Sequence, residues 1–360
     1  MTDPSTDPRS PDLPPVPPRA LAGMTTLRVG GPARAVVGAS TRDELVHAVA
    51  KADAEGEPVL LVGGGSNLLV ADAGFPGAVV RIGTRGVEVG QAEPGRVRVR
   101  VAAGEPWEGF VATAVDSGWS GVEALSGIPG STGATPIQNV GAYGAEVAQL
   151  ISSFEVLDRQ TGAVGPMEHA RAGFGYRSSA LKRARGRWVV LSVTFDLAID
   201  PRSAPIRYAE LAGVLGVEVG DRPPAAAVRQ AVLELRRGKG MVLDPADHDT
   251  WSAGSFFTNP MLTPEQAEAL PAGAPRFGQP DGSVKTSAAW LISHAGFPRG
   301  FTVRPGARAA LSTKHSLALT NRGGATAEDL LELARAVRAG VADRFGIVLE
   351  NEPVLVGCAL

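Results

Sequence analysis

The sequence has little cysteine, no long apolar run and no excess of charge of one sign. Its single cysteine, Cys358, cannot form a disulfide within the chain, which favours a reducing compartment and predicts a cytoplasmic protein. No apolar stretch reaches the roughly 18 residues of a membrane span, and the N-terminal residues lack an apolar signal region. A net charge of −2 and a pI of about 6.3 give no indication of a nucleic-acid or membrane-surface partner.

The five histidines are scattered along the chain, and no two have the spacing of a local metal site, so no metal is predicted. What remains is ordinary for a globular protein. The chain has 360 residues, 44% hydrophobic and 20% charged, which suits two or three domains. Residues 1–18 are largely proline, aspartate and serine with almost no large apolar side chain, and we predict a disordered tail there.

Local patterns predict a mixture of helices and strands. Thr41 and Glu44 have the spacing of a capping box, which opens an amphipathic helix ending near Ala54. Residues 97–102 alternate valine with arginine, as is typical of a strand with one buried face. Further strands are expected at 59–62, 68–70, 79–82, 154–158 and 188–197, and further helices at 106–117, 225–237, 286–294 and 329–345.

The stretch Leu125–Gly144 is too rich in glycine and proline for a helix or a regular strand. Apolar residues such as Ile128 and Val140 are interleaved with the glycines, which favours ordered backbone wrapped around a ligand over a long surface loop. Glycine lets backbone N–H groups approach an anion, and the amides of Gln138 and Asn139 suit the edge of a heterocycle.

A second glycine-rich segment, Gly63–Asn67, directly follows the strand expected at 59–62. A strand that runs into glycines is in principle a phosphate-binding arrangement. It is not a Walker loop, because no Gly-Lys-Ser/Thr follows. Nor is it a dinucleotide fingerprint, because another strand and not a helix is expected after it.

Three further segments carry candidate polar groups. Arg177 lies among small residues, as a surface turn residue or a site residue would, and Lys239 lies between two glycines as a surface charge or an anion contact. Glu350 and Glu352 alternate within a β-like apolar run at 347–356, so both would face the same way. A carboxylate in a buried strand is costly unless paired, which makes at least one of them a functional candidate.

Five segments, in this order, resemble the UDP-N-acetylenolpyruvoylglucosamine reductases, flavoenzymes of bacterial peptidoglycan synthesis. The matching segments are residues 59–67, 128–144, FGYRS at 174–178, GSFFTNP at 254–260 and LENE at 349–352. Each motif alone is weak, but five in the family order are not expected by chance. Together they span residues 27–357.

The resemblance implies an α+β fold. A two-subdomain FAD-binding domain of the vanillyl-alcohol-oxidase type is expected at residues 19–200, and a C-terminal α+β substrate-binding domain at 201–360, with its last strand returning to the active site. The implied cofactors are non-covalent FAD and NADPH as reductant. The implied reaction reduces UDP-N-acetylglucosamine enolpyruvate to UDP-N-acetylmuramate, by hydride transfer through flavin N5 and protonation by a serine.

Site residues follow from the same resemblance. Ser255 would protonate C2, while Arg177 and Glu352 would flank the enolpyruvyl carboxylate. Tyr208, Lys239 and Asn259 would hold the UDP diphosphate, in the longer family type with a tyrosine lid. Many members have Pro-Glu-Val where this chain has Asn351-Glu352-Pro353, so Glu350 remains an alternative to Glu352. The expected flavin-binding residues are Gly63, Gly64, Gly65, Ser66, Asn67, Leu68, Pro129, Gly130, Ser131, Gly133, Ala134, Gln138, Asn139, Gly141, Ala142, Tyr143 and Gly144.

Two rival functions are open at this point. An oxygen-using oxidase of the same fold often attaches FAD through a histidine in the first loop, and the loop at 63–67 contains neither histidine nor cysteine. That argues against covalent attachment but not against oxidation. A non-catalytic flavin or nucleotide-sugar binding protein would predict damage at Arg177, Ser255 or Glu352, and all three are present.

Overall fold

The computed structural model describes residues 20–360, and these form two compact units. Unit 1 comprises residues 20–32, Ser66–Phe75 and Leu243–Leu360, and unit 2 comprises Ala33–Gly65 and Pro76–Val242. This division differs from the expected boundary at residues 200/201, because the segment up to Val242 belongs with unit 2 and residues 66–75 belong with the C-terminal part. The tail predicted at residues 1–18 lies outside the described residues.

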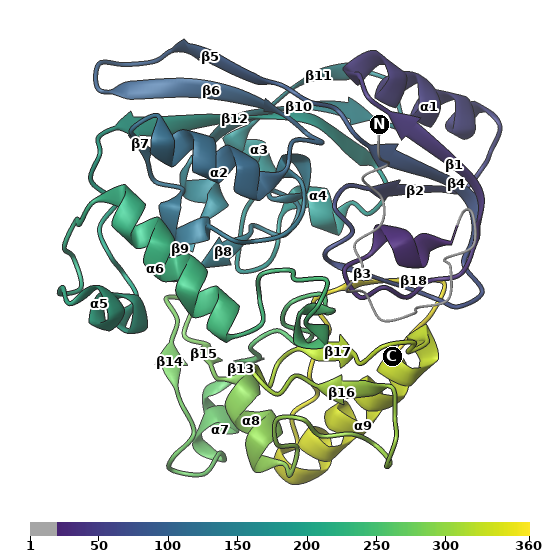
Figure 1. Ribbon diagram of the computed structural model, residues 1–360, viewed down its shortest axis with the longest axis vertical. Helices are drawn as coiled ribbons and strands as arrows, with labels where there is room; N and C mark the ends of the chain where they lie inside the picture. Colours follow the sequence, from purple (N-terminus) through teal and green to yellow (C-terminus); the bar gives the residue numbers. More distant parts are fainter. Residues whose placement is uncertain (1–19) are drawn as a thin grey trace, which may run out of the picture. The chain divides into compact units, whose positions relative to one another are not determined.

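Unit 2 contains two main sheets (Figure 1). A small sheet has the strand order β1-β4-β2, and a larger antiparallel sheet has the order β11-β10-β12-β6-β5, with β7 paired to β12. The strands are β1 (Ala33–Ala39), β2 (Val59–Val62), β4 (Phe75–Ile82), β5 (Val87–Gln91), β6 (Arg96–Ala102), β7 (Trp119–Ser120), β8 (Gly141–Ala142), β9 (Ala145–Glu146), β10 (Ile151–Asp158), β11 (Val164–Glu168) and β12 (Trp188–Ile199).

Three of the six α-helices described in unit 2 match the helices predicted near residues 41–54, 106–117 and 225–237, and the other three were not predicted. The predicted capping box is confirmed, because Thr41 Oγ1 accepts from Glu44 N–H and Glu44 accepts from Thr41 N–H. Pro106 is the N-cap of α2 rather than its first residue. The helices are α1 (Arg42–Ala54), α2 (Trp107–Asp116), α3 (His169–Ala172), α4 (Ala180–Arg183), α5 (Ala209–Leu215) and α6 (Ala225–Gly238).

The alternation in β6 decides which face of the larger sheet is buried. Val97, Val99 and Val101 are buried in one core with Trp107 and Phe110 of α2 and Phe195 of β12, whose ring centroids lie 5.1–5.9 Å apart. The arginines between the valines point outward: Arg98 pairs with Asp196 at 2.7 Å and Arg100 with Glu155 at 2.6 Å. The predicted half-buried strand is therefore confirmed, and its buried face supports the helix that precedes the second glycine-rich loop.

Unit 1 is built on α9 (Ala327–Phe345), which packs on β16 and β17 and against α8. Thr326 caps α9, with Asp329 completing the capping box. β3 pairs in parallel with β18, so Leu68–Val70 joins the C-terminal strand. The other elements are β3 (Leu68–Val70), β13 (Met261–Leu262), α7 (Pro264–Glu268), β14 (Phe277–Gly278), β15 (Val284–Lys285), α8 (Ala288–His294), β16 (Ala309–Leu311), β17 (Leu319–Asn321) and β18 (Val354–Val356).

The long strand predicted at residues 347–356 is wrong in extent. Only β18 (Val354–Val356) is regular, and Asn351 forms an isolated bridge with Phe257. Glu350 and Glu352 precede the strand, and Glu350 is exposed. The apolar run reflects separate burial of Ile347 and Leu349 in the core of unit 1, not a continuous ladder. Glu350 therefore carries no burial cost that would require a partner.

Candidate active site

The two glycine-rich loops of unit 2 meet where each lacks side chains. A Cβ at Gly64 would lie 2.6 Å from Gly130 Cα, and one at Gly63 would overlap the Ser131 hydroxyl. Gly65 and Gly130 have φ values of +63° and +118°, which L side chains rarely adopt. Glycine is thus required in these loops for two reasons: the two backbones approach each other closely, and some residues have positive φ.

The same place offers backbone donors. Within residues 20–360, the N–H groups of Gly64 and Gly65 have no protein acceptor, and Gly65 is buried. A buried N–H without a partner is costly, so a site of this kind is completed by a ligand or water. Donors at the end of a strand, with no Cβ in the way, suit the phosphates of a dinucleotide. This arrangement fits the FAD expected from the sequence.

One expected flavin-binding residue, Gly133, has a different role in the structure. The N–H of Gly133 donates to Ala103 O at 2.8 Å, and the N–H of Ala134 donates to Ser131 O at 3.0 Å. Neither can also point at a phosphate. Gly133 is needed for another reason, because a Cβ there would lie 2.5 Å from the Cβ of Ala103 at the end of β6. Gly133 therefore packs the loop onto the large sheet instead of binding an anion through its N–H.

Asn139 has a structural role that the sequence did not indicate. Its Nδ2 donates to Glu146 at 2.8 Å and to Gly175 O at 3.2 Å, and its Oδ1 accepts from Ala148 N–H at 3.1 Å. The side chain is buried and its polar atoms are engaged by protein, so it holds the second loop to β9 and to the segment before Arg177. The edge of the heterocycle would therefore be bound by other groups of the loop.

Two residues that the sequence analysis did not single out fix the same loop. Ser179 caps α4 and donates from Oγ to Ile137 O at 2.6 Å, and Glu146 is the partner of Asn139. The polar Ser178-Ser179 pair before a short helical pattern was the available signal for the cap. No local pattern indicates the Glu146 contact, because β8 and β9 are only two residues each.

Arg177 is held against the second loop in a strained conformation. Its guanidinium donates to Gly141 O at 2.8 Å and to Asn139 O at 3.4 Å. Its φ is +50°, and a Cβ at Gly141 would lie 3.2 Å from the Arg177 Nη1. Asn139, Tyr143 and Arg177 are three of the four described non-glycine residues with positive φ. Strain of this kind gathers at functional sites, which supports the prediction that Arg177 is more than a turn residue.

Around Tyr143 the predicted diphosphate contacts of unit 2 come together. The rings of Tyr143 and Tyr208 meet edge to face with centroids 5.7 Å apart, and Lys239 Nζ lies 5.6 Å from the Tyr143 ring. Lys239 pairs with Glu210 at 2.6 Å. Burial raises the pKa of Tyr143 to about 12, so its phenol is protonated and able to donate at neutral pH.

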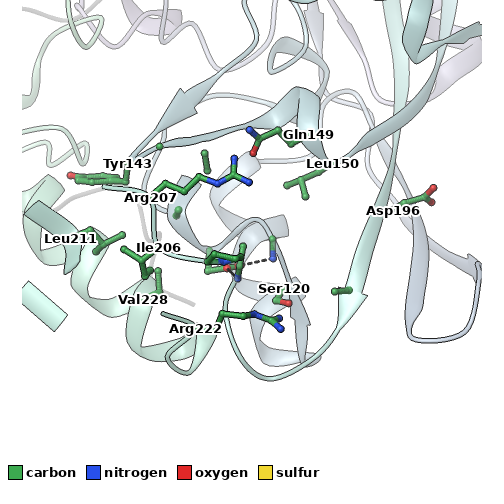
Figure 2. A pocket seen from close by; sticks show the side chains of 18 of the residues that line it. Ser120, Tyr143, Gln149, Leu150, Asp196, Ile206, Arg207, Leu211, Arg222 and Val228 are labelled. Atoms are coloured by element: carbon green, nitrogen blue, oxygen red, sulfur yellow. Dashed lines mark hydrogen bonds between the residues drawn. The ribbon is translucent and has the colours of Figure 1, made fainter. Parts of the chain in front are cut away.

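Beside this group lies a cavity of about 290 Å³ (Figure 2). Arg207 extends into it toward Gln149, and Ile206 and Leu211 form part of its wall. Glu123, which is buried, accepts from the N–H groups of Gly121 and Ala204, each at 2.6 Å. Burial raises the pKa of this carboxyl, opposed by those two backbone donors.

In unit 1, the GSFFTNP segment runs beside the chain end. Glu352 N–H donates to Phe256 O at 2.8 Å, and Thr258 N–H donates to Glu350 O at 3.0 Å. Phe256 N–H donates to Leu317 O at 2.7 Å, and both phenylalanines are buried in the core. Ser255 is thus carried on a backbone fixed from two sides, and its hydroxyl has no protein partner in the part of the chain that the structure describes.

Asn67, which belongs to unit 1, bonds to the same part of the chain end. Its carbonyl accepts from Val354 N–H at 2.9 Å, and its Nδ2 donates to Glu352 O at 3.4 Å. Glu352 is therefore held on both sides, by Phe256 and by Asn67, and is partly buried. Asn259 Oδ1 accepts from Ala288 N–H at 2.9 Å, at the start of α8. Of the three predicted catalytic residues, unit 1 holds Ser255 and Glu352, and unit 2 holds Arg177.

Comparison with known proteins places the chain in a family. A model described as an FAD binding domain matches residues 33–165, and one described as the UDP-N-acetylenolpyruvoylglucosamine reductase C-terminal domain matches residues 244–356. A reductase of that name from Cutibacterium acnes is 54% identical over 340 residues, which cover 94% of this chain and 90% of the relative. The chain belongs to the UDP-N-acetylenolpyruvoylglucosamine reductase family. Another member, from Salinispora arenicola, is 55% identical over 347 residues, covering 94% and 95% of the two chains.

A solved structure agrees. The UDP-N-acetylenolpyruvylglucosamine reductase from Thermus caldophilus superimposes with a TM-score of 0.61 at 29% identity, covering 94% of this chain and 97% of that one. The predicted α+β fold with an FAD-binding domain is confirmed, as is the class of FAD-dependent oxidoreductase acting in peptidoglycan synthesis. Among the described residues no helix is long and apolar enough to cross a membrane. The same residues contain no group of three or more His, Cys, Asp or Glu able to hold a metal ion.

Proposed function

We propose that this reductase converts UDP-N-acetylglucosamine enolpyruvate to UDP-N-acetylmuramate with NADPH as the reductant, in the cytoplasm. When bound, FAD supplies the hydride carrier between NADPH and C3 of the enolpyruvyl group. A proton added at C2 completes the reduction, so that a hydride and a proton together saturate the double bond. Family membership supports the substrate, and the flavin-binding domain supports the redox chemistry.

The chain's own contribution begins with the flavin loops. Gly64 and Gly65 direct N–H groups at the phosphates, since these donors lack a protein acceptor within residues 20–360. The other loop residues proposed to bind the phosphates are Ser66, Gly130 and Ser131. When FAD is bound, the loop from Gln138 to Gly144 would line the isoalloxazine, and Asn139 holds the backbone of that loop in place. First-loop residues 63–67 contain no histidine or cysteine, which argues against a covalent bond to the cofactor.

Arg177 meets the carboxylate of the enolpyruvyl group. A guanidinium can bind a carboxylate in bidentate geometry, and negative charge develops on that carboxylate as the hydride arrives at C3. The bonds from Arg177 to Gly141 O and Asn139 O set the orientation of the guanidinium before substrate binds. A group that is already oriented needs little reorganisation in the transition state, which is where its stabilisation counts.

Ser255 gives its proton to C2. A serine hydroxyl is a poor acid in water, so it acts only next to the negative charge that develops on the substrate. The hydroxyl makes no hydrogen bond to protein in the described residues, and its backbone is fixed by the neighbouring Phe256. Glu352, whose N–H bonds to Phe256 O, is the charged group anchored next to that segment.

Tyr208, Lys239 and Asn259 bind the UDP diphosphate. Lys239 supplies a cation, Tyr208 a phenol and Asn259 an amide, all of which donate to phosphate oxygens. Asn259 Oδ1 accepts a hydrogen bond from the N-terminus of α8, so its Nδ2 remains to donate to the ligand.

The observation that carries the proposal is the glycine-only contact between the two loops at Gly64 and Gly130. The test is the spectrum of the purified protein. We expect a yellow preparation that bleaches with NADPH without oxygen and recovers its colour when the enolpyruvyl substrate is added. Reoxidation by oxygen but not by that substrate would instead assign the chain to an oxidase.

Replacement of Gly65 tests the first loop. Because Gly65 has φ +63° and is buried, a valine there would strain the backbone and block the approach of the cofactor, so we expect Gly65→Val protein to lack FAD. Gly162→Val is the matched control, since φ is +72° there but a Cβ would meet open space in the β10–β11 turn. Flavin absorbance per protein measures the outcome. A full flavin complement in Gly65→Val would refute the loop assignment, and loss in both variants would point to general misfolding.

A further inference from the structure

The ion pair between Lys239 and Glu210 lies at the junction of two helices. Glu210 Oε2 and Lys239 Nζ are 2.6 Å apart, and both side chains are partly exposed. Glu210 is in the first turn of α5, two residues after Tyr208, and Lys239 caps the C-terminus of α6. The helices pack through Leu211 and Val232 in a small core of their own. The pair therefore links the start of α5 to the C-terminus of α6.

This carboxylate sits among the groups that face the proposed diphosphate. Lys239 is 5.6 Å from the ring of Tyr143, which meets Tyr208 edge to face at 5.7 Å. Among the charged neighbours of Tyr143, Arg236 is a cation and Glu210 an anion. Arg236 donates to Met241 O, just after the end of α6. Glu210 is thus the one carboxylate in contact with the cation that the proposed function assigns to the diphosphate, as far as residues 20–360 show.

We propose that Glu210 is the counter-ion of Lys239 in the free enzyme and that the substrate diphosphate displaces it. The inference rests on the proposed function, because it takes Lys239 as the diphosphate contact. An ammonium group has three donors, but a carboxylate at contact distance both occupies one of them and repels phosphate oxygens. An exposed ion pair of this kind is weak, so a doubly charged diphosphate can replace it.

The displacement also concerns Tyr208. Glu210 and Tyr208 share the start of α5, and the ion pair ties that start to the end of α6. When phosphate takes the place of Glu210, the tie is removed while the apolar contact of Leu211 with α6 stays.

Binding of UDP to the FAD-loaded protein, measured by titration calorimetry, tests the counter-ion role. Glu210→Gln frees the ammonium and removes the repulsion, so the Kd for UDP should fall, by roughly fivefold at low salt, and less at high salt. Glu234→Gln is the control, since Glu234 lies on α6 and accepts from Gln230 without touching Lys239. Its Kd should equal that of the wild type. Melting curves check that each variant is folded.

A double substitution tests whether Glu210 acts through its contact with Lys239 or through its charge at a distance. With Lys239→Met there is no ammonium to release, so adding Glu210→Gln should restore little or no affinity. A full fivefold gain in that background would overturn the counter-ion role, as would weaker UDP binding in Glu210→Gln alone. If Lys239→Met leaves the Kd unchanged, the proposed diphosphate site itself fails. If Lys239→Met weakens binding but Glu210→Gln does not strengthen it, only the role of Glu210 fails.

Discussion

In a Ser255→Ala variant, flavin reduction by NADPH is expected to proceed at nearly the wild-type rate, whereas reoxidation by the enolpyruvyl substrate slows by about 10²–10⁴-fold. The first half-reaction moves only a hydride and needs no proton at C2. The second needs an acid, and alanine leaves none at this position. Since the Ser255 hydroxyl makes no bond to protein in the described residues, its loss removes no structural contact.

Stopped-flow absorbance at the flavin band follows both steps in one protein. Thr258→Val is the matched control, because it removes a hydroxyl from the same segment. Among the described residues, that hydroxyl makes only a long 3.4 Å bond to Glu350 O. Its two half-reactions should both stay near wild type. If Ser255→Ala slows the two half-reactions equally, Ser255 is not the proton donor.

Local signals predicted most of the elements that surround the site. The capping boxes at Thr41 and Thr326 set the starts of α1 and α9, and the Val/Arg alternation set the buried face of β6. Each of these depends on residues within a few positions of one another. The two glycine-rich loops were found in the same way, since an excess of glycine in an apolar context is visible in the sequence alone.

Contacts between distant parts of the chain could not be predicted in this way. β3 pairs with β18, although Leu68 and Val354 are far apart in sequence, and that pairing moves residues 66–75 into unit 1. Gly133 was expected to bind the flavin, but its N–H donates to Ala103 O. That bond depends on how the loop packs on β6. No local rule fixes which acceptor a loop N–H will meet, because that depends on packing of elements joined only in the fold.

Glu350 and Glu352 near the C-terminus show the same difference between what local patterns predict and what distant contacts decide. A strand through both residues would have made them equivalent in direction, and only the family register separated them. The structure gives them different surroundings: Glu352 is partly buried and bonded through its backbone to Phe256 and Asn67, whereas Glu350 is exposed. This supports Glu352 as the group that acts beside Ser255 on the substrate.

Glu352→Gln is therefore expected to slow substrate reduction strongly, by about 3–4 kcal/mol of transition-state stabilisation. The amide keeps the shape and removes the charge, while the backbone bonds to Phe256 and Asn67 remain.

Glu350→Gln is the matched control, which removes the same charge from an exposed residue two positions away. It should leave the rate near wild type and change stability by no more than about 0.5 kcal/mol, as is usual for surface substitutions. Single-turnover rates of flavin reoxidation, with melting curves for both variants, decide between them. A slow Glu350→Gln enzyme beside a fast Glu352→Gln enzyme would exchange the two roles and place the acting carboxylate on the exposed side of the segment.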